Sequence, residues 1–204
     1  MELGKEDKID LIKDKIISIT RHSIEGRARL HSHNTGFSLC EPSRDFKPGQ
    51  VLGHWMSLIL VSGESLRMTI KLHYDLHDVK TIAYRTYGKA SEDQLSDKQA
   101  LDFMKELCNL SAGQLVKIFE ENNLPMGMSL PLCARGFYEI FSDYTPTVKP
   151  FVKFSDLWSI KCDDCVFMMS CVVEILDTFA LRNILKYEIP TEAESNDDGE
   201  MDFL

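Results

Sequence analysis

Five small or polar residues between positions 102 and 120 have the spacing of a single helix face. Asp102, Glu106, Asn109, Gly113 and Glu120 all fall within about 40° of Asp102 when the chain is wound into an α-helix. Glu106 and Asn109 are three residues apart, so their side chains point into the same space. A carboxylate beside a carboxamide offers an acceptor for a cation and a group that both donates and accepts hydrogen bonds. We call these five residues the polar stripe.

The polar stripe by itself has two interpretations. Acids and amides on an exposed helix face are usually just solvated, and Gly113 can simply allow another helix to pack closely. Gly113 costs a helix about 1 kcal/mol relative to Ala, but on this stripe it also leaves a flat place that another surface can approach. The spacing therefore leaves a solvated face and a binding face both open.

The long helix that carries the stripe is predicted for residues 96–122. Ser96 and Gln99 form an S-x-x-Q capping box at its start. The apolar residues opposite the stripe fall within one narrow arc: Ala100, Met104, Leu107, Leu115 and Ile118, with the small Ser111 between them. We expect this arc to be the buried side of the helix and the stripe to be the exposed side.

The segments ahead of this helix predict one more long helix and a hairpin. Isoleucines at helical spacing predict a helix over residues 5–25, with Gly26 as its C-cap. Residues 31–50 lack a clean period and are expected to be mostly loop with one short strand. Residues 54–62 and 66–72 are separated by a short turn and are typical of a β-hairpin.

The remaining pattern predicts an α+β fold, with a mainly antiparallel sheet and long helices packed on it. Asp75 is expected to cap a short helix that reaches residue 87, with Gly88 at its end, and Asp177 to cap a last helix that reaches residue 187. Behind the stripe, four segments are strand-like: residues 137–141, 148–154, 157–162 and 166–175. Paired strands joined by short turns, with helices between the pairs, favour this class of fold.

Charge and hydropathy exclude several classes of function. The chain has 204 residues, with 23 Lys and Arg against 32 Asp and Glu, so its formal net charge is −9. Nonspecific binding to nucleic acid or to an anionic membrane needs a basic face, so neither partner is expected. There is no apolar run of the roughly 18 residues that span a membrane, and no signal peptide is visible. The six cysteines are expected to be reduced thiols, so we predict a cytoplasmic protein.

The charge is concentrated at the C-terminal end of the sequence. Residues 191–204 carry six acids and no base, which leaves a net charge of only −3 for residues 1–190. This polar segment contains few apolar residues and follows Pro190. We therefore predict a single domain over residues 1–190, which includes the N-terminal helix, and an acidic tail over residues 191–204.

The stripe and its flanks resemble the signature of the CheC/CheX/FliY chemotaxis phosphatases. That signature is Asp or Ser, three residues, Glu, two residues, Asn, and then a Pro a little over twenty residues later. Asp102, Glu106 and Asn109 match in type and spacing, and Pro131 follows Asn109 with 21 residues between them. The resemblance covers roughly residues 50–175 in the order of elements and is specific over about residues 100–131.

The number of motifs points to one branch of this family. Some members carry the motif twice, on two pseudo-symmetric helices, whereas this chain carries it once. The nearest counterpart in the first helix is Asp10, Asp14 and Ile17, and an isoleucine cannot position a water. The chain thus resembles the single-site CheX branch, so the resemblance implies a CheX-like domain over residues 1–190 and a homodimer.

The resemblance also implies an activity. The substrate would be a CheY-like response-regulator receiver domain of two-component signalling, phosphorylated on Asp, with Mg²⁺ held by the receiver. Asn109 would orient the attacking water, and Glu106 would pair with the active-site Lys of the receiver. Asp102, Gly113 and Pro131 would have supporting roles. The protein would be a hydrolase with no nucleophile, metal or cofactor of its own.

Two other interpretations remain open. The first is a catalytically silent docking module that binds a receiver or another signalling protein through the same face. The second is a structural dimer with a metal at Cys162-Asp163-Asp164-Cys165, although no second CxxC exists to complete a zinc site. That motif is better explained as a turn between two strands. Nothing in the sequence links the pair His31 and His33 to this motif. His73 and His77, four residues apart, could bind a metal but are expected to be surface residues.

The acidic tail generates the first testable prediction. Truncation after Pro190 should leave the melting temperature nearly unchanged, because a segment with six acids and few apolar residues contributes little to a core. Differential scanning calorimetry of the full chain and the truncated chain measures this. A large drop in melting temperature would show that the tail docks, and Phe203 and Leu204 would then be the residues to examine.

Overall fold

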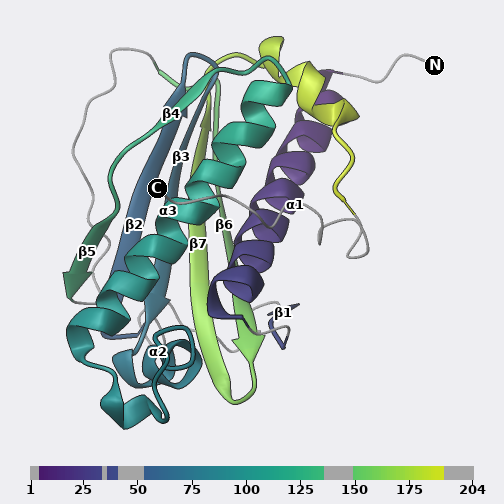
Figure 1. Cartoon of the computed structure of the whole chain (residues 1–204). Coiled ribbons are helices and arrows are strands. Elements are labelled where there is room, and N and C mark those ends of the chain that lie inside the picture. The colour runs from purple at the N-terminus through teal and green to yellow at the C-terminus, as the bar shows by residue number, and fades with distance from the viewer. Residues whose placement is uncertain (1–4, 34–35, 41–52, 136–148, 191–204) are drawn as a thin grey trace.

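One antiparallel sheet carries both long helices on the same face (Figure 1). The structure is a computed structural model that describes residues 5–33, 36–40, 53–135 and 149–190. The strands are β1 (Ser38–Cys40), β2 (Trp55–Gly63), β3 (Leu66–Tyr74), β4 (Met126–Met128), β5 (Leu132–Arg135), β6 (Val152–Cys162) and β7 (Cys165–Ile175). The helices are α1 (Lys5–Ser32), α2 (Leu76–Ala83) and α3 (Asp97–Glu121), with 3₁₀-helices η1 (Glu92–Gln94) and η2 (Ala180–Lys186).

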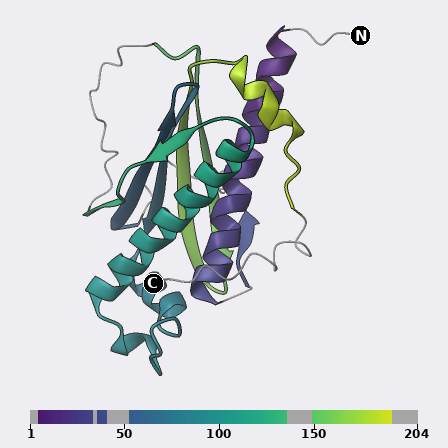
Figure 2. The ribbon, with the colours of Figure 1, turned by 45° about the horizontal axis from the view of Figure 1, so that its top comes forward.

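The strand order is β1-β6-β7-β3-β2-β4, and β5 pairs with β2 beside β4. Every pair of strands in the described residues is antiparallel. The helices α1 and α3 lie side by side over the sheet, and α2 lies next to the start of α3 (Figure 2). The predicted α+β fold, with a mainly antiparallel sheet and long helices packed on it, is therefore confirmed.

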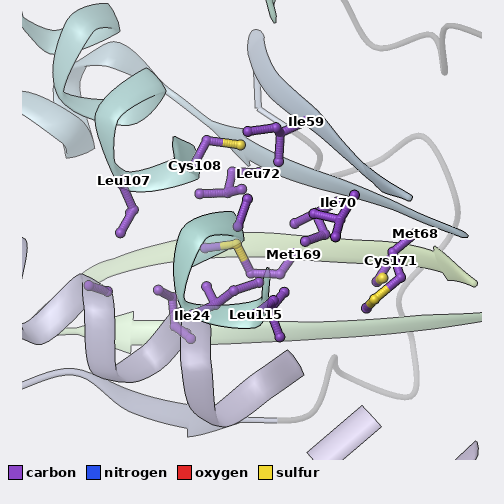
Figure 3. Close-up of a cluster of buried hydrophobic side chains, with 14 of the residues drawn as sticks. Ile24, Ile59, Met68, Ile70, Leu72, Leu107, Cys108, Leu115, Met169 and Cys171 are labelled. Carbon is purple, nitrogen blue, oxygen red and sulfur yellow. The ribbon is translucent and has the colours of Figure 1, made fainter. Parts of the chain in front are cut away.

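The core lies between the sheet and the two long helices (Figure 3). Every second residue of β3 and β7 points toward the helices, as the period of a strand requires. The buried residues labelled in Figure 3 come from both layers: Ile24, Leu107, Cys108 and Leu115 from the helices, and Ile59, Met68, Ile70, Leu72, Met169 and Cys171 from the sheet. This packing fixes the rotation of each helix about its own axis, because only one side of the helix is apolar.

The long helix α3 agrees closely with the sequence prediction. Its N-cap is Ser96, whose hydroxyl accepts from the Gln99 backbone N–H at 3.2 Å, while the Gln99 side chain accepts from the Ser96 N–H at 3.1 Å. Both halves of the predicted capping box are therefore present. The predicted apolar arc is buried, and Phe103, Cys108, Ala112 and Phe119 widen it.

The prediction for the first helix was wrong at its C-terminal end. Gly26 does not cap α1, which continues to Ser32. The helix continues because Ile24 and Ala28 are fully buried and extend its apolar side by another turn. A β-carbon added at Gly26 would meet nothing within 4 Å, so no contact requires a glycine there. The apolar side therefore decides where α1 ends.

The short helix α2 ends earlier than predicted and lacks the predicted cap. It stops at Ala83, and a series of turns then leads to Gly88, whose φ is +62°. The Asp75 side chain makes no capping hydrogen bond. Its carboxylate instead accepts from the His54 backbone N–H at 3.0 Å and contacts the His54 ring. His54, which lies directly ahead of β2, thus competes with the helix for the Asp75 side chain.

The strands behind α3 differ from the prediction in number and length. One strand, β6, replaces the two expected at residues 148–154 and 157–162, and β4 and β5 were not predicted. The expected strand at residues 137–141 lies outside the described residues, as does residue 148. The last predicted helix is the 3₁₀-helix η2, and Asp177 accepts from the Phe179 N–H at 2.7 Å just ahead of it. The hairpin of β2 and β3 and the short strand β1 are confirmed.

No helix in the described part of the chain is long and apolar enough to cross a lipid bilayer.

Replacement of Gly26 tests the continuation of α1. Gly26→Ala should stabilise the protein by about 1 kcal/mol, because alanine is the better helix former and its methyl group meets nothing. The midpoint of urea unfolding measures the change. Gly53→Ala is the matched control: the φ of Gly53 is +73° and a β-carbon there would come within 2.5 Å of the Tyr74 backbone, so it should destabilise. A loss of stability in Gly26→Ala would show that the helix does not run through this position.

Candidate functional site

The polar stripe lies on the side of α3 that faces away from the sheet. Glu106 and Asn109 are half-buried, Glu120 is exposed, and the buried side of the helix is opposite to them. The prediction that Glu106 is not buried against the sheet is therefore confirmed. The capping box and the apolar side of α3 together hold the stripe toward solvent.

Glu106 and Asn109, the predicted catalytic pair, are not engaged by the rest of the described structure. Among the described residues, neither the Glu106 carboxylate nor the Asn109 amide forms a hydrogen bond or an ion pair. A carboxylate and an amide that stay half-exposed and unsatisfied by their own chain can each bind a group on another molecule.

Asp102 has a local partner. Its carboxylate pairs with Lys105 Nζ at 2.6 Å, three residues along the same helix, and the two side chains are 44% and 38% exposed. This ion pair raises the pKa of Lys105. A pair at this exposure contributes at most about 1 kcal/mol to stability. The main consequence of this ion pair is that the Lys105 ammonium group lies at Asp102, one helical turn before Glu106.

Gly113 leaves an open surface on α3. A β-carbon built at this position would meet nothing within 4 Å. The interpretation that Gly113 lets another helix pack closely is therefore wrong for the described structure. The neighbouring contact to α1 is made by Gln114, whose side chain accepts a hydrogen bond from Arg27. The other interpretation, a flat place that another surface can approach, remains a prediction.

Pro131 lies in the connection between β4 and β5, directly ahead of β5. The same connection is fixed to the edge of the sheet by Ser129, whose N–H donates to the Leu60 carbonyl at 2.9 Å. The following strand brings Cys133 opposite Ser57 of β2 and within electrostatic reach of Lys105. Pro131 thus introduces the strand beside α3, and the supporting role implied by the resemblance stays a prediction.

Tyr87 is a residue of this surface that the sequence analysis missed. It lies in the turns after α2, and its hydroxyl donates to the Gln99 carbonyl at 3.2 Å. Burial raises the pKa of the Tyr87 phenol, and so do the carboxylates of Asp102 and Glu106, whereas Lys105 lowers it. The hydrogen bond to Gln99 places the phenol at the start of α3, three residues before Asp102, the first residue of the stripe. Nothing in the local sequence signals this, because Tyr87 reaches the start of α3 only through the packing of α2 on α3.

The CxxC motif has the geometry of a tight turn. Cys162 and Cys165 are paired residues at the ends of β6 and β7, and Asp163 has a φ of +53° in the two-residue turn between them. Burial and the carboxylate of Asp78 raise the pKa of Cys165 to about 11, which disfavours the thiolate that binds metals. Within the described residues, no group of three or more His, Cys, Asp or Glu side chains could hold a metal ion.

The prediction that His73 and His77 are surface residues is wrong for one of them. His73 is buried on β3, with its ring 3.3 Å from the Ser170 hydroxyl. The His31 ring stacks on Phe103 of α3 at 4.2 Å, and its Nε2 lies 3.2 Å from the Phe103 carbonyl oxygen. Burial lowers the pKa of His31. His31 thus connects the end of α1 to α3, whereas His33 is exposed. His77 is exposed, as predicted.

Comparison with known proteins reveals the fold but no sequence relative. No sequence-family model matches this chain, and neither does any curated protein. The chain is similar in structure to the CheX–CheY–BeF₃–Mg²⁺ complex from Borrelia burgdorferi, with a TM-score of 0.58 and 12% identity over 78% of this chain and 97% of that one. The chemotaxis protein CheX from Vibrio vulnificus gives 0.57 and 14% over 78% and 95%. FliY from Thermotoga maritima gives 0.53 and 16% over 91% and 98%.

These three structures define the class of fold. This chain has the CheC/CheX/FliY fold, which the motif around Glu106 and Asn109 implied from the sequence. At 12–16% identity, the likeness is one of architecture. The fold alone therefore does not define what this chain does.

The juxtaposition of Tyr87 and Glu106 can be tested without a partner. Glu106→Gln should lower the pKa of Tyr87 toward its ordinary value, because a neighbouring negative charge disfavours the phenolate. Difference absorbance titration of the variant, with Tyr87→Phe used to identify the signal, measures this. Glu120→Gln is the control, since Glu120 lies about 21 Å further along the helix. If the pKa of Tyr87 is the same with and without the Glu106 charge, then the two side chains are not neighbours.

Proposed function

We propose that this protein is a phosphatase that hydrolyses the aspartyl-phosphate of a CheY-like response-regulator receiver domain. The observation that carries the proposal is the pair Glu106 and Asn109, which project from one exposed face of α3 with no partners among the described residues. Their types and spacing match the motif of the CheC/CheX/FliY phosphatases. The fold gives further support, because one structure of this fold is a CheX–CheY complex.

The reaction needs positioning more than it needs a nucleophile from this protein. Water attacks phosphorus in line, the bond from phosphorus to the receiver Asp oxygen breaks, and inorganic phosphate and the free carboxylate result. Asn109 accepts a hydrogen bond from the water through its amide oxygen and so holds the water on the side opposite the leaving oxygen. Mg²⁺ on the receiver supplies charge stabilisation, and the proposal assigns no metal or cofactor to this chain.

Glu106 sets how the two proteins meet. In this proposal its carboxylate pairs with the active-site Lys of the receiver, a charge-assisted contact of about 1.5–3 kcal/mol. The nearest cation on its own helix, Lys105, is held by Asp102 at 2.6 Å. Because that ion pair keeps Lys105 away, the Glu106 charge remains available to a cation on the partner.

The proposal places the reaction in the cytoplasm, a reducing compartment. All six cysteines are free thiols in the structure, which suits the cytoplasm, where receivers of two-component systems act. The homodimer that the resemblance implies is also part of the proposal, and analytical ultracentrifugation would measure it.

A catalytically silent docking module is the second candidate. One observation favours it: no hydrogen bond within the described residues holds Asn109 or Glu106 in a single rotamer. Enzymes usually fix their reacting groups in advance, whereas a docking surface is free to adapt to its partner. The phosphatase proposal requires that the receiver itself orders the Asn109 side chain when it binds.

Replacement of single stripe residues tests the proposed roles. Asn109→Ala should abolish most dephosphorylation while binding to the receiver persists, because positioning one water contributes little to affinity. It should not unfold α3, since Ala has the higher helix propensity. Glu106→Ala should lose activity and should also weaken binding about ten-fold or more. The reason is that it removes the charge-assisted contact with the receiver Lys, which contributes about 1.5–3 kcal/mol. Phosphate release and isothermal titration calorimetry across the receivers of the same cell measure both quantities.

Glu120→Ala is the matched control, because it removes an exposed acid about 21 Å from Glu106 on the same helix. It should change neither quantity strongly. Equal rates of phosphate loss with Asn109→Ala and with wild type would contradict the catalytic role. If wild type then binds a receiver but does not speed phosphate loss at substoichiometric amounts, the docking module is the correct interpretation.

A further inference from the structure

We propose that Tyr87 is an affinity-determining contact residue for the partner that docks on the polar stripe, and that its ring excludes water from the ion pair made by Glu106. This inference rests on the proposed function, since it concerns the receiver-binding surface. Tyr87 is 36% exposed, and its side chain borders the stripe from a different element of the fold. It is absent from the sequence motif that carries the resemblance.

The Tyr87 side chain is held in place on the free protein. Its hydroxyl donates to the Gln99 carbonyl in the first turns of α3. The turns that carry it are closed by a hydrogen bond from the Lys89 N–H to the Tyr84 carbonyl at 2.9 Å. A ring with only two side-chain torsions, already tied at its hydroxyl, loses little conformational entropy when a partner covers it.

The elements on either side of these turns are themselves connected. Lys80 of α2 pairs with Asp97 at the start of α3 at 2.6 Å. The Thr81 hydroxyl donates to the Glu92 carboxylate of η1 at 2.9 Å. These contacts fix α2 relative to α3, and so they fix the distance between the Tyr87 ring and the stripe.

The chemistry at this position suits the rim of a polar interface. A half-exposed tyrosine has an apolar body and a polar tip, and this type of residue is enriched where protein partners bind tightly. Its hydroxyl is bonded to Gln99, next to the ion pair of Asp102 and Lys105 on α3. The carboxylate of Glu106, which has no ion pair among the described residues, also acts on the phenol. When a partner covers the ring, the effective dielectric around Glu106 falls and its attraction for a cation rises. Tyr87 thus acts on affinity through Glu106, while Asn109 is left to the chemical step.

The affinity of a receiver activated with beryllofluoride and Mg²⁺ tests this inference. Tyr87→Ala should weaken binding about ten-fold or more, whereas Tyr87→Phe, which keeps the ring, should change it less than about three-fold. The turnover number at saturating phosphorylated receiver should stay within about two-fold of wild type in both variants. Tyr84→Ala is the matched control: Tyr84 lies in the same turns, but its ring contacts Arg85 rather than the stripe.

A double-mutant cycle separates shielding from a merely structural role. In a Glu106→Ala background, Tyr87→Ala should weaken binding by less than about three-fold, because no ion pair remains to be shielded. An equal loss in both backgrounds would overturn the claim that the ring acts through Glu106. A loss in Tyr84→Ala as large as that in Tyr87→Ala would show that the fold of the turns, and not the ring, sets affinity.

A second measurement uses the unaltered protein, in case Tyr87→Ala unfolds. Tetranitromethane should nitrate Tyr87 in the free protein, and the bound receiver should reduce this at least five-fold by mass spectrometry of the peptide. Unchanged nitration of Tyr87 in a complex that does form would overturn the inference while the proposed function stands. If wild type neither binds nor dephosphorylates any receiver of its cell, the proposed function itself fails, and this inference fails with it.

Discussion

Burial of the apolar side of α3 is the constraint on which the candidate site depends. The side chains from Ala100 to Ile118 that face the sheet are almost fully inaccessible, so α3 cannot rotate about its axis without exposing them. This fixes the direction of the opposite side, where Glu106 and Asn109 lie. The two residues need no bonds of their own to be presented to solvent, because the core on the other side of the helix holds them there (Figure 3).

The electrostatics of the stripe follow from two local contacts. Lys105 pairs with Asp102, and Tyr87, from the turns after α2, donates a hydrogen bond to the Gln99 carbonyl at the start of α3. The first contact neutralises one acid, and the second covers one flank of the surface. Of the two acids on the N-terminal half of the stripe, Asp102 is therefore paired, whereas Glu106 has no ion pair in the described structure. In the proposed function, this carboxylate beside the Asn109 amide would favour a partner that presents a well-placed cation.

Architecture and function are separable in this protein. The structural likeness to CheX and FliY extends over more than three quarters of this chain, at identities of no more than 16%. So little shared sequence can still maintain the same layers, because a core requires only apolar residues of suitable size at the right period. A catalytic or binding site, by contrast, requires particular side chains at particular positions. The proposed function therefore depends on the residues of the stripe and not on the fold alone.

The sequence by itself determined the local features. The capping box at Ser96, the buried arc of α3 and the hairpin of β2 and β3 were all predictable, because helix and strand periods and caps depend on neighbours within a few residues. The end of α1 and the length of β6 were not, because buried contacts with distant residues override local signals such as Gly26. The same holds for the site. Glu106 and Asn109 share a face by spacing alone, whereas Tyr87 reaches that face only through the packing of α2 on α3. A contact between residues far apart in the chain has no period, so only the tertiary structure decides it.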